Sequence, residues 1–248
     1  NNEGALRRAF AFICANPEYE HYYVCIGPHK QLHYVIPCNV FYLDEAHVNY
    51  SLFDLVLNVT DKTFTTILNI AGITRNLTNK QELSETALEF GFNVPATSNF
   101  ADLDTVFVKP VMSSGAYAVE DFCYRPIKFE EIKKLGLDPT KYLIQQFIDS
   151  RFTLQFSVIS DGNTLQIYDI ILLEFDRDRL GKSLVVYGES LIHQIDEHRM
   201  QCDKIITFLK IHGYDKIKGI FSLQFLHTSE NSSEWYLHDF NSRTGPFT

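Results

Sequence analysis

The sequence predicts a mixed fold of α/β and α+β type in two parts: an open α/β domain over residues 1–95 and a β-rich domain over residues 96–248. In the first part, strand-like apolar runs alternate with helical runs, which is typical of parallel α/β construction. Beyond Pro95 most runs are β-rich. A hydrophobic content of 45% with 14% aromatic residues is ample for a buried core.

The N-terminal part starts with ALRRAFAFICANPEYEHYYVCIGP, which reads as a helix, a turn at Asn16 and Pro17, and a short strand that ends at Gly27. The run FDLVLNV reads as a second buried strand, and FTTILNIAGI is helical up to Gly72. These elements together predict a small open α/β unit.

A well-marked helix follows in LTNKQELSETALEFGFNVP. Thr78 is its predicted N-cap, Gln81 completes a capping box, and Gly91 ends the helix. Lys80 falls in the first turn, where the helix dipole disfavours a cation by roughly 0.3 kcal/mol or more unless an anion lies nearby. The helix alone leaves two readings of Lys80 open, a surface lysine and an anion ligand.

The β-rich part opens with TVFVKPVMSSGAYAVEDFCYR, which reads as a hairpin around a loop of small residues. Lys109 ends the first strand, and Ser113, Ser114 and Gly115 follow it. Such a loop suits a phosphate, because its backbone N–H groups approach closely while the ammonium supplies charge. The pattern is not a Walker P-loop, in which the lysine opens a helix. The alternative is a solvated lysine at a strand end.

Further strands of an antiparallel sheet are predicted in YLIQQFIDSRFTLQFSVI, TLQIYDIILLEF and SLVVYGESLIH, followed by a helix in EHRMQCDKIITFLKIHGY and closing strands in IFSLQFL and WYLHDFNSR. The run YLIQQFID is a candidate hinge between two β-rich pieces. Its backbone groups and apolar side chains suit a flat heterocycle; a simple buried strand is the alternative. The hinge residues are Gln145, Gln146, Phe147 and Ile148.

The last strand carries Asp239, Asn241 and Arg243 at alternate positions, so these side chains share one face. Gln224 lies within an apolar run and requires a partner if it is buried. With Asp239 and Asn241 it offers the oxygen ligands that Mg²⁺ takes when phosphate and water complete its shell. The competing reading is an ion pair between Asp239 and Arg243. His238 is predicted to face away from this row.

Composition excludes several classes of function. The net charge of -9 argues against a nucleic-acid partner. No apolar run approaches a membrane span, and the N-terminus lacks the apolar segment of a signal peptide. The cysteines are scattered and show no spacing typical of a disulfide framework or a zinc site, so we expect a cytoplasmic protein. They are Cys14, Cys25, Cys38, Cys123 and Cys202. No histidine has a visible Ser or Cys partner for a hydrolytic triad. We expect the protein to act on small molecules. Whether it forms a homo-oligomer is left open by the sequence.

The order of the motifs resembles the ATP-grasp superfamily, and most closely the large chain of carbamoyl-phosphate synthetase and the related carboxylate-amine ligases. The resemblance is carried by the helix lysine in NKQELSETALEFGFNVPAT, the strand lysine in FVKPVMSSGAYAV, the hinge YLIQQFID, and a Gln strand followed by Asp-x-Asn-x-Arg. The start of the chain is similar to the pre-ATP-grasp domain of that group.

The resemblance implies that residues 96–248 form a two-lobed ATP-grasp domain with ATP between its lobes. Lys80, Lys109 and the loop Ser113-Ser114-Gly115 would contact the phosphates, and the hinge residues 145–148 would lie beside adenine. Arg243, together with Lys109, would face the transferred phosphoryl group. The Mg²⁺ ligands that it implies are Gln224, Asp239 and Asn241.

The resemblance also implies an activity: an ATP- and Mg-dependent ligase that activates a small-molecule carboxylate as an acyl phosphate for attack by an amine or similar nucleophile. Arg151 and the glutamines of the hinge motivate an alternative, a degenerate ATP-grasp module that binds nucleotide or a partner without turnover. A third reading, an α/β binding domain without nucleotide, requires Lys109 and Asp239 to lie far apart.

Overall fold

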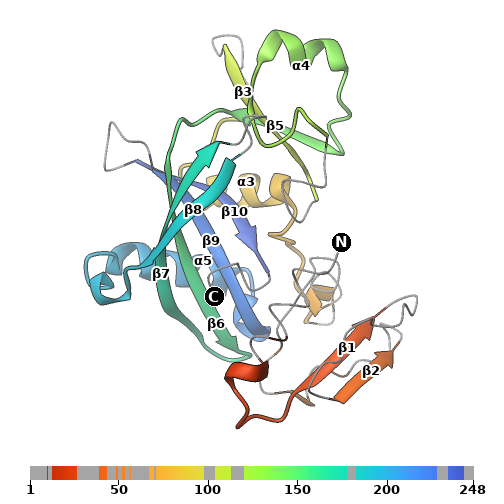
Figure 1. Cartoon of the computed structure of the whole chain (residues 1–248), viewed down its shortest axis with the longest axis vertical. Coiled ribbons are helices and arrows are strands. Elements are labelled where there is room, and N and C mark those ends of the chain that lie inside the picture. The colour runs from red at the N-terminus through yellow and green to blue at the C-terminus, as the bar shows by residue number, and fades with distance from the viewer. Residues whose placement is uncertain are drawn as a thin grey trace.

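The structure is a computed structural model, and it describes residues 10, 13–26, 39–43, 49, 52–53, 56, 67–69, 71–97, 104–112, 120–177, 183–227 and 234–242. A small sheet with one helix lies at one end, a parallel strand pair lies at the other, and a five-stranded sheet lies between them (Figure 1). The described part of the chain is therefore mixed α/β. None of its helices is long and apolar enough to cross a membrane.

The parallel pair consists of β1 (Tyr22–Ile26) and β2 (Asn39–Leu43). β1 is the strand that the sequence predicts to end near Gly27, whereas β2 is not predicted. Phe53 and Val56 are the described residues of the FDLVLNV run, and neither lies in a strand. The other residues of that run lie outside the described ranges. That this region is a pre-ATP-grasp domain, with a boundary near residue 95, stays a prediction.

The small sheet has the order β4-β3-β5 and is antiparallel. Side chains alternate along the central strand β3, so Val106 and Val108 pack into a core with Ile132, while Phe107 and Lys109 lie on the opposite face. The elements of this end are β3 (Thr105–Pro110), β4 (Pro126–Lys128), α4 (Phe129–Leu135) and β5 (Tyr142–Gln146).

The structure differs from the hairpin that the sequence predicts after β3. Residues 120–125 form turns, and the partner strand β4 begins only at Pro126. The turn is fixed by Tyr124, which has a positive φ of 60° and whose N–H donates to Val108 O at 2.9 Å. The intervening loop residues 113–119 lie outside the described ranges.

The larger sheet has five antiparallel strands in the order β10-β9-β6-β7-β8, as the sequence predicts for this half. The long strands β6 and β9 lie at its centre and pair along their full lengths. The strands are β6 (Phe152–Asp161), β7 (Leu165–Arg177), β8 (Ser183–Ser190), β9 (Lys218–His227) and β10 (Trp235–Asn241). The short helices η4 (Ile192–Gln194) and η5 (Tyr214–Lys216) flank α5 (Arg199–Ile211).

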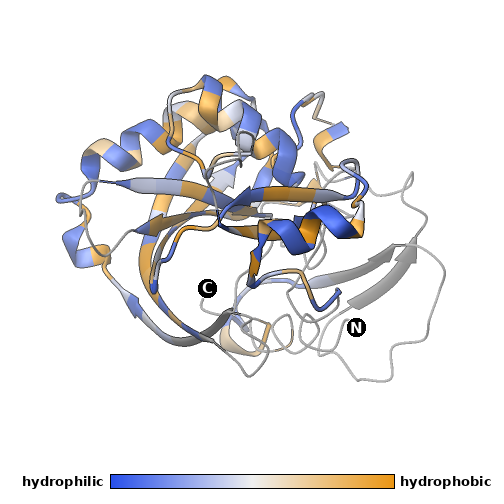
Figure 2. Ribbon diagram, turned by 90° about the horizontal axis from the view of Figure 1, so that it is seen from above, coloured by the Kyte–Doolittle hydropathy of each residue, from blue (hydrophilic) through white to orange (hydrophobic). Residues whose placement is uncertain are grey.

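One face of this sheet forms the main core with α5 and with the segment that contains α3 (Lys80–Glu89). Phe92, just after α3, lies with its ring centroid 5.3 Å from Phe208 of α5 and 5.6 Å from Phe225 of β9. Hydrophobic and hydrophilic residues alternate along the helices, which is what helices covering a sheet require (Figure 2). The region around α3 and the sheet thus share one core.

The helix α3 begins one residue later than the sequence predicts. Its N-cap is Asn79, whose side-chain oxygen accepts from the N–H groups of Gln81 at 3.0 Å and Glu82 at 3.2 Å. The hydroxyl of Thr78 is turned to Asn76 instead and donates to its Oδ1 at 2.6 Å. The prediction of Thr78 as N-cap is therefore wrong.

Candidate functional site

The two lysines singled out in the sequence come together because the start of α3 is attached to the end of β3. Lys80 N–H donates to Val111 O at 3.0 Å, two residues after Lys109. Both side chains are buried, with 5% of Lys80 and 4% of Lys109 exposed. This burial excludes the readings of Lys80 as a surface lysine and of Lys109 as a solvated strand end.

Both ammonium groups point to β10. Lys80 Nζ lies 3.6 Å from Asp239 Oδ1. Lys109 Nζ donates to His238 O at 2.9 Å, lies 3.4 Å from His238 Nδ1, and sits 5.7 Å from the centre of the Phe107 ring. Side chains from α3, β3 and β10 thus form one cluster. Lys109 and Asp239 are neighbours, and the reading that requires them to be far apart does not hold.

A β-bulge places His238 in this cluster. Leu237 pairs with Phe225 and Asp239 pairs with the next residue of β9, Gln224, so His238 is one extra residue on β10. The strict alternation of faces is interrupted there, and the side chains of both His238 and Asp239 reach a lysine. The prediction that His238 faces away from the row of Asp239 is therefore wrong.

Burial shifts the protonation equilibria of the cluster. Desolvation lowers the pKa of Lys109 to about 8; Asp239 opposes this shift and Lys80 adds to it. Desolvation, together with the two lysines, lowers the pKa of His238 to about 3 against the opposing effect of Asp239. Among the described residues, the cluster therefore joins two lysine side chains and one carboxyl group to an imidazole that is neutral at neutral pH, and the two lysines suit an anion.

Polar side chains continue from Asp239 across the sheet. Asp239 pairs with Gln224 on β9, and Gln224 pairs with Gln155 on β6. Gln224, which is half-buried, donates through Nε2 to Oε1 of the buried Gln155 at 2.9 Å. Asn241, two residues after Asp239 on β10, pairs with Ser222, two residues before Gln224 on β9. The structure therefore brings Gln224, Asp239 and Asn241 together on two adjacent strands.

This oxygen set fits Mg²⁺. Because the amide nitrogen of Gln224 donates to Gln155, its Oε1 is the atom left for a ligand, beside the oxygens of Asp239 and Asn241. Within the described ranges, no group of three or more His, Cys, Asp or Glu side chains is placed to hold a metal ion. The ligand role of these three residues stays a prediction. Arg243, and with it the proposed ion pair to Asp239, lies outside the described residues.

The hinge contacts the lysine cluster through a relay. Gln145 is 1% exposed, and its Nε2 donates to Ser84 Oγ at 3.2 Å. Ser84 Oγ in turn donates to Lys80 O at 3.0 Å, inside the first turn of α3. Gln145 Oε1 is buried and has no hydrogen-bond partner among the residues that the structure describes. The amide of Gln145 therefore presents an acceptor that a ligand's N–H could use.

The other hinge residues divide between two sides. The ring of Phe147 stacks on Phe107, with centroids 6.4 Å apart and an interplanar angle of 25°. Phe107 is also the ring that the Lys109 ammonium lies over, so Phe147 contacts a neighbour of Lys109. Gln146 instead contacts Ala96, with its N–H donating to Ala96 O at 2.7 Å and its Oε1 accepting from Ala96 N–H at 3.5 Å. Ile148 is 9% exposed. Ser113, Ser114 and Gly115 lie outside the described residues.

Sequence reasoning missed Ser84, Phe107, Gln155 and His238. A signal for Gln155 exists: the tripeptide Leu-Gln-Phe occurs in both β6 and β9, and the two glutamines pair in register. A glutamine at the same place in two apolar strands indicates a shared polar row. The positions of Ser84 and His238 depend on tertiary contacts and on the bulge, for which the sequence has no signal.

Comparisons with known proteins found similarity at the level of structure alone. No protein-family model and no curated protein matches the sequence. N5-carboxyaminoimidazole synthetase from Staphylococcus aureus has a TM-score of 0.58 at 15% identity, over 98% of this chain and 68% of that chain. VanG D-Ala:D-Ser ligase from Enterococcus faecalis has a TM-score of 0.50 at 18% identity, over 84% and 65%.

The chain is shorter than the proteins it resembles. It spans 49% of an L-amino acid ligase from Bacillus licheniformis, which has a TM-score of 0.49 at 14% identity over 84% of this chain. The Staphylococcus and Enterococcus enzymes are both ATP-grasp ligases, and the similarity to them extends over most of the present chain. The chain has the fold of the ATP-grasp superfamily.

Proposed function

We propose that the protein is an ATP- and Mg-dependent ligase that activates a carboxylate as an acyl phosphate for attack by an amine or similar nucleophile. The observation that carries the proposal is the cluster of the buried Lys80 and Lys109 with the half-buried Asp239, contributed by three different elements. Two neighbouring ammonium groups that converge on one strand form a site whose charge and hydrogen-bond donors match a polyanion. The phosphates of ATP supply such an anion.

The proposed roles follow the order of the cluster. Lys80 and Lys109, with the loop at 113–115, contact the phosphates, and hinge residues 145–148 lie beside the adenine. When bound, Mg²⁺ held by Gln224, Asp239 and Asn241 would neutralise phosphate charge. Arg243 completes the set by facing the transferred phosphoryl group.

The proposed chemistry needs no protein nucleophile. A carboxylate oxygen of the substrate attacks the terminal phosphorus of ATP, and ADP leaves. The amine then attacks the acyl carbon and loses a proton, and inorganic phosphate leaves. Lys109 and Arg243 serve the first step by stabilising negative charge on the phosphoryl group in flight. The remaining work is to hold the reactants in line.

The partners we propose are a small-molecule carboxylate and a small-molecule amine, in the cytoplasm. The described cysteines Cys14, Cys123 and Cys202 are free thiols. Arg151, which motivates the alternative of a module without turnover, is paired with Glu174 on β7 at 2.5 Å. This pair offers a partner for Arg151 other than a nucleotide, although 69% of its side chain is exposed.

The test is calorimetric titration of Mg-ATP into the wild-type protein and the Asp239→Asn variant. We expect magnesium-dependent binding that weakens by about tenfold or more in the variant, because one charge-assisted interaction is worth roughly 1.5 kcal/mol or more. The free energy of unfolding should change little. Asp203→Asn, at an exposed position on α5, is the matched control and should bind like the wild type.

Two outcomes separate the alternatives. A folded wild-type protein that binds no Mg-ATP contradicts the proposal. Binding without release of ADP in single-turnover experiments, with a panel of carboxylic acids and amines present, favours the module that binds nucleotide without turnover. Release of ADP that depends on one acid identifies the substrate.

A further inference from the structure

His238 is the one member of the lysine cluster for which the proposed function has no role. It is the extra residue of the β10 bulge, and it contacts Lys109 twice, through its backbone oxygen at 2.9 Å and through Nδ1 at 3.4 Å. The bulge turns its side chain toward the lysines, away from the orientation that strict alternation predicts. The inference below rests on the proposed function.

The contact with Lys109 fixes which ring nitrogen carries the proton. An ammonium group has only donors, so Nδ1 must accept through its lone pair. In a neutral imidazole the other nitrogen, Nε2, then bears the hydrogen. His238 is therefore a hydrogen-bond donor at Nε2, and Lys109 sets this tautomer.

The Nε2 atom of His238 is buried. It has no hydrogen-bond partner in the described part of the chain. Leaving a buried donor unpaired is unfavourable, so an unpaired donor beside a charged cluster indicates an acceptor supplied from outside. Because Lys80 and Lys109 both lie at this place, the acceptor with matching chemistry is an oxyanion.

We infer that His238 binds the phosphate chain of the nucleotide: its Nδ1 positions the Lys109 ammonium, and its Nε2–H donates to a phosphate oxygen. A neutral donor is suited to this place. A third cation beside two buried ammonium groups would add repulsion, whereas an imidazole N–H supplies a directed hydrogen bond without further charge. His238 is thus both a positioning residue for Lys109 and a contact to the ligand.

Two variants separate the two ring nitrogens. In His238→Asn the amide oxygen can take the place of Nδ1 and accept from Lys109, but nothing reaches the place of Nε2. In His238→Gln the amide nitrogen can take the place of Nε2 and donate, while the acceptor at Nδ1 is lost. The backbone oxygen of residue 238 still accepts from Lys109 in both variants, because the bulge is unchanged.

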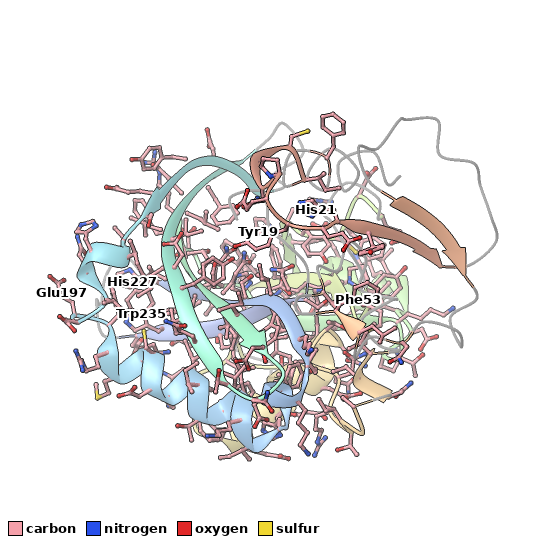
Figure 3. The ribbon with its side chains drawn as sticks, turned by 90° about the horizontal axis from the view of Figure 1, so that it is seen from below. Tyr19, His21, Phe53, Glu197, His227 and Trp235 are labelled. Atoms are coloured by element: carbon pink, nitrogen blue, oxygen red, sulfur yellow. The ribbon has the colours of Figure 1, made fainter. Side chains whose placement is uncertain are left out.

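The readout is the dissociation constant of Mg-ATP, with adenosine as a ligand that lacks the phosphates. We expect His238→Asn to weaken Mg-ATP binding about tenfold, the effect of one hydrogen bond to a charged group, and His238→Gln to restore most of it. Adenosine binding should be equal in all variants. His227→Asn is the control, because His227 is not part of the lysine cluster. It lies on β9 beside Trp235, with ring centroids 4.5 Å apart, near Glu197 (Figure 3).

A second measurement needs no nucleotide. The ¹⁵N resonances of the His238 ring in the wild-type protein, assigned by comparison with His238→Gln, should show a protonated Nε2 and an unprotonated Nδ1. A protonated Nδ1 overturns the inference, whatever the variants do. This measurement also keeps the inference testable if His238→Asn fails to fold.

The outcomes distinguish this inference from the proposed function on which it rests. Equal Mg-ATP affinity in the wild type and His238→Asn overturns the role of His238 and leaves the ligase proposal intact. Absence of Mg-ATP binding by the folded wild type overturns both. A loss that is equal for adenosine and Mg-ATP shows a general structural effect and overturns the phosphate contact.

Discussion

Lys109 shows how burial changes the chemistry of one residue. A lysine at a strand end in water keeps a pKa near the ordinary value of 10.5, whereas burial lowers the pKa of Lys109 to about 8. The groups that face it are Asp239 and His238 on β10 and Lys80 on α3, and the carboxylate only partly offsets desolvation and the second ammonium. Its charge is therefore lost at a pH where an exposed lysine is still cationic.

This shift predicts that Mg-ATP binding weakens above pH 8. As pH rises through the pKa of Lys109, the cation that we propose to contact the phosphates is lost, so affinity falls by up to about tenfold per pH unit for one proton. His238, with a pKa of about 3, does not titrate in this window. The measurement is the Mg-ATP dissociation constant between pH 7 and 9.5.

Lys109→Arg is the control for this profile, because a guanidinium stays charged throughout the window. Its profile should be flat above pH 8, even if its affinity is lower at every pH. A wild-type profile as flat as that of the variant would contradict the assignment of Lys109 to the phosphates.

The residues that could be recognised from sequence are those whose chemistry conflicts with their local setting. Lys80 in the first turn of a helix and Gln224 inside an apolar strand each required a partner, and the structure provides Asp239 for the first and Gln155 for the second. Ser84 has no such conflict, since a serine on a helix needs no explanation. Its contact with Gln145 spans 61 residues and exists only in the folded chain.

At the level of elements, the type of each segment was predictable and its details were not. Patterns of period 2 and 3.6 report which face is apolar, and they predict the helix α3 and the antiparallel strands. The starting residue of α3 depends on which of two adjacent polar side chains caps it, and the hydroxyl of Thr78 is turned to Asn76 instead. Thr78 is the predicted cap, but asparagine is as common at this position, so the pattern alone does not decide between them.

The position of the cap can be tested by substitution. Asn79→Ala should lower the free energy of unfolding by about 1 kcal/mol, because two backbone N–H groups lose their acceptor. The measurement is urea unfolding followed by circular dichroism. Asn79→Asp retains an acceptor and places a negative charge at the helix start, so it should be as stable as the wild type or more so. Equal stability of the alanine variant would mean that Asn79 is not the cap.

For the whole molecule, the connection between distant segments is carried by the main core and by Tyr214. The Tyr214 hydroxyl, which is fully buried, donates to Arg75 O and accepts from Leu77 N–H, both at 2.9 Å. Leu77 and Arg75 lie 137 and 139 residues before Tyr214 in the sequence. Tyr214 thus ties the approach to α3 to the start of β9, and with it Lys80 to the sheet that carries Asp239.

We predict that Tyr214→Phe destabilises the whole unit by roughly 1–3 kcal/mol, because Leu77 N–H loses a buried acceptor. Hydrogen exchange should show equal loss of protection in α3 and β9, as expected when both unfold together. Tyr187→Phe, at an exposed position on β8, is the control and should have little effect. A loss confined to α3 would show that the helix unfolds separately from the sheet.

The mixed α/β class of the described part could be predicted because strand and helix patterns are local and both occur along the chain. The arrangement of the two antiparallel sheets could not, because it depends on long-range pairing such as β6 with β9. The shared core of α3 and the larger sheet likewise requires contacts between residues more than a hundred positions apart.

The bulge on β10 has a consequence for comparing this chain with other proteins of its fold. A relative whose last strand lacks the bulge has one residue fewer between the position of Leu237 and that of Asp239. An alignment without a gap would then place a residue of the apolar face opposite Asp239. A single gap at position 238 restores the correspondence, so comparisons of this strand should be anchored on Asp239 and Asn241 and counted backward from them.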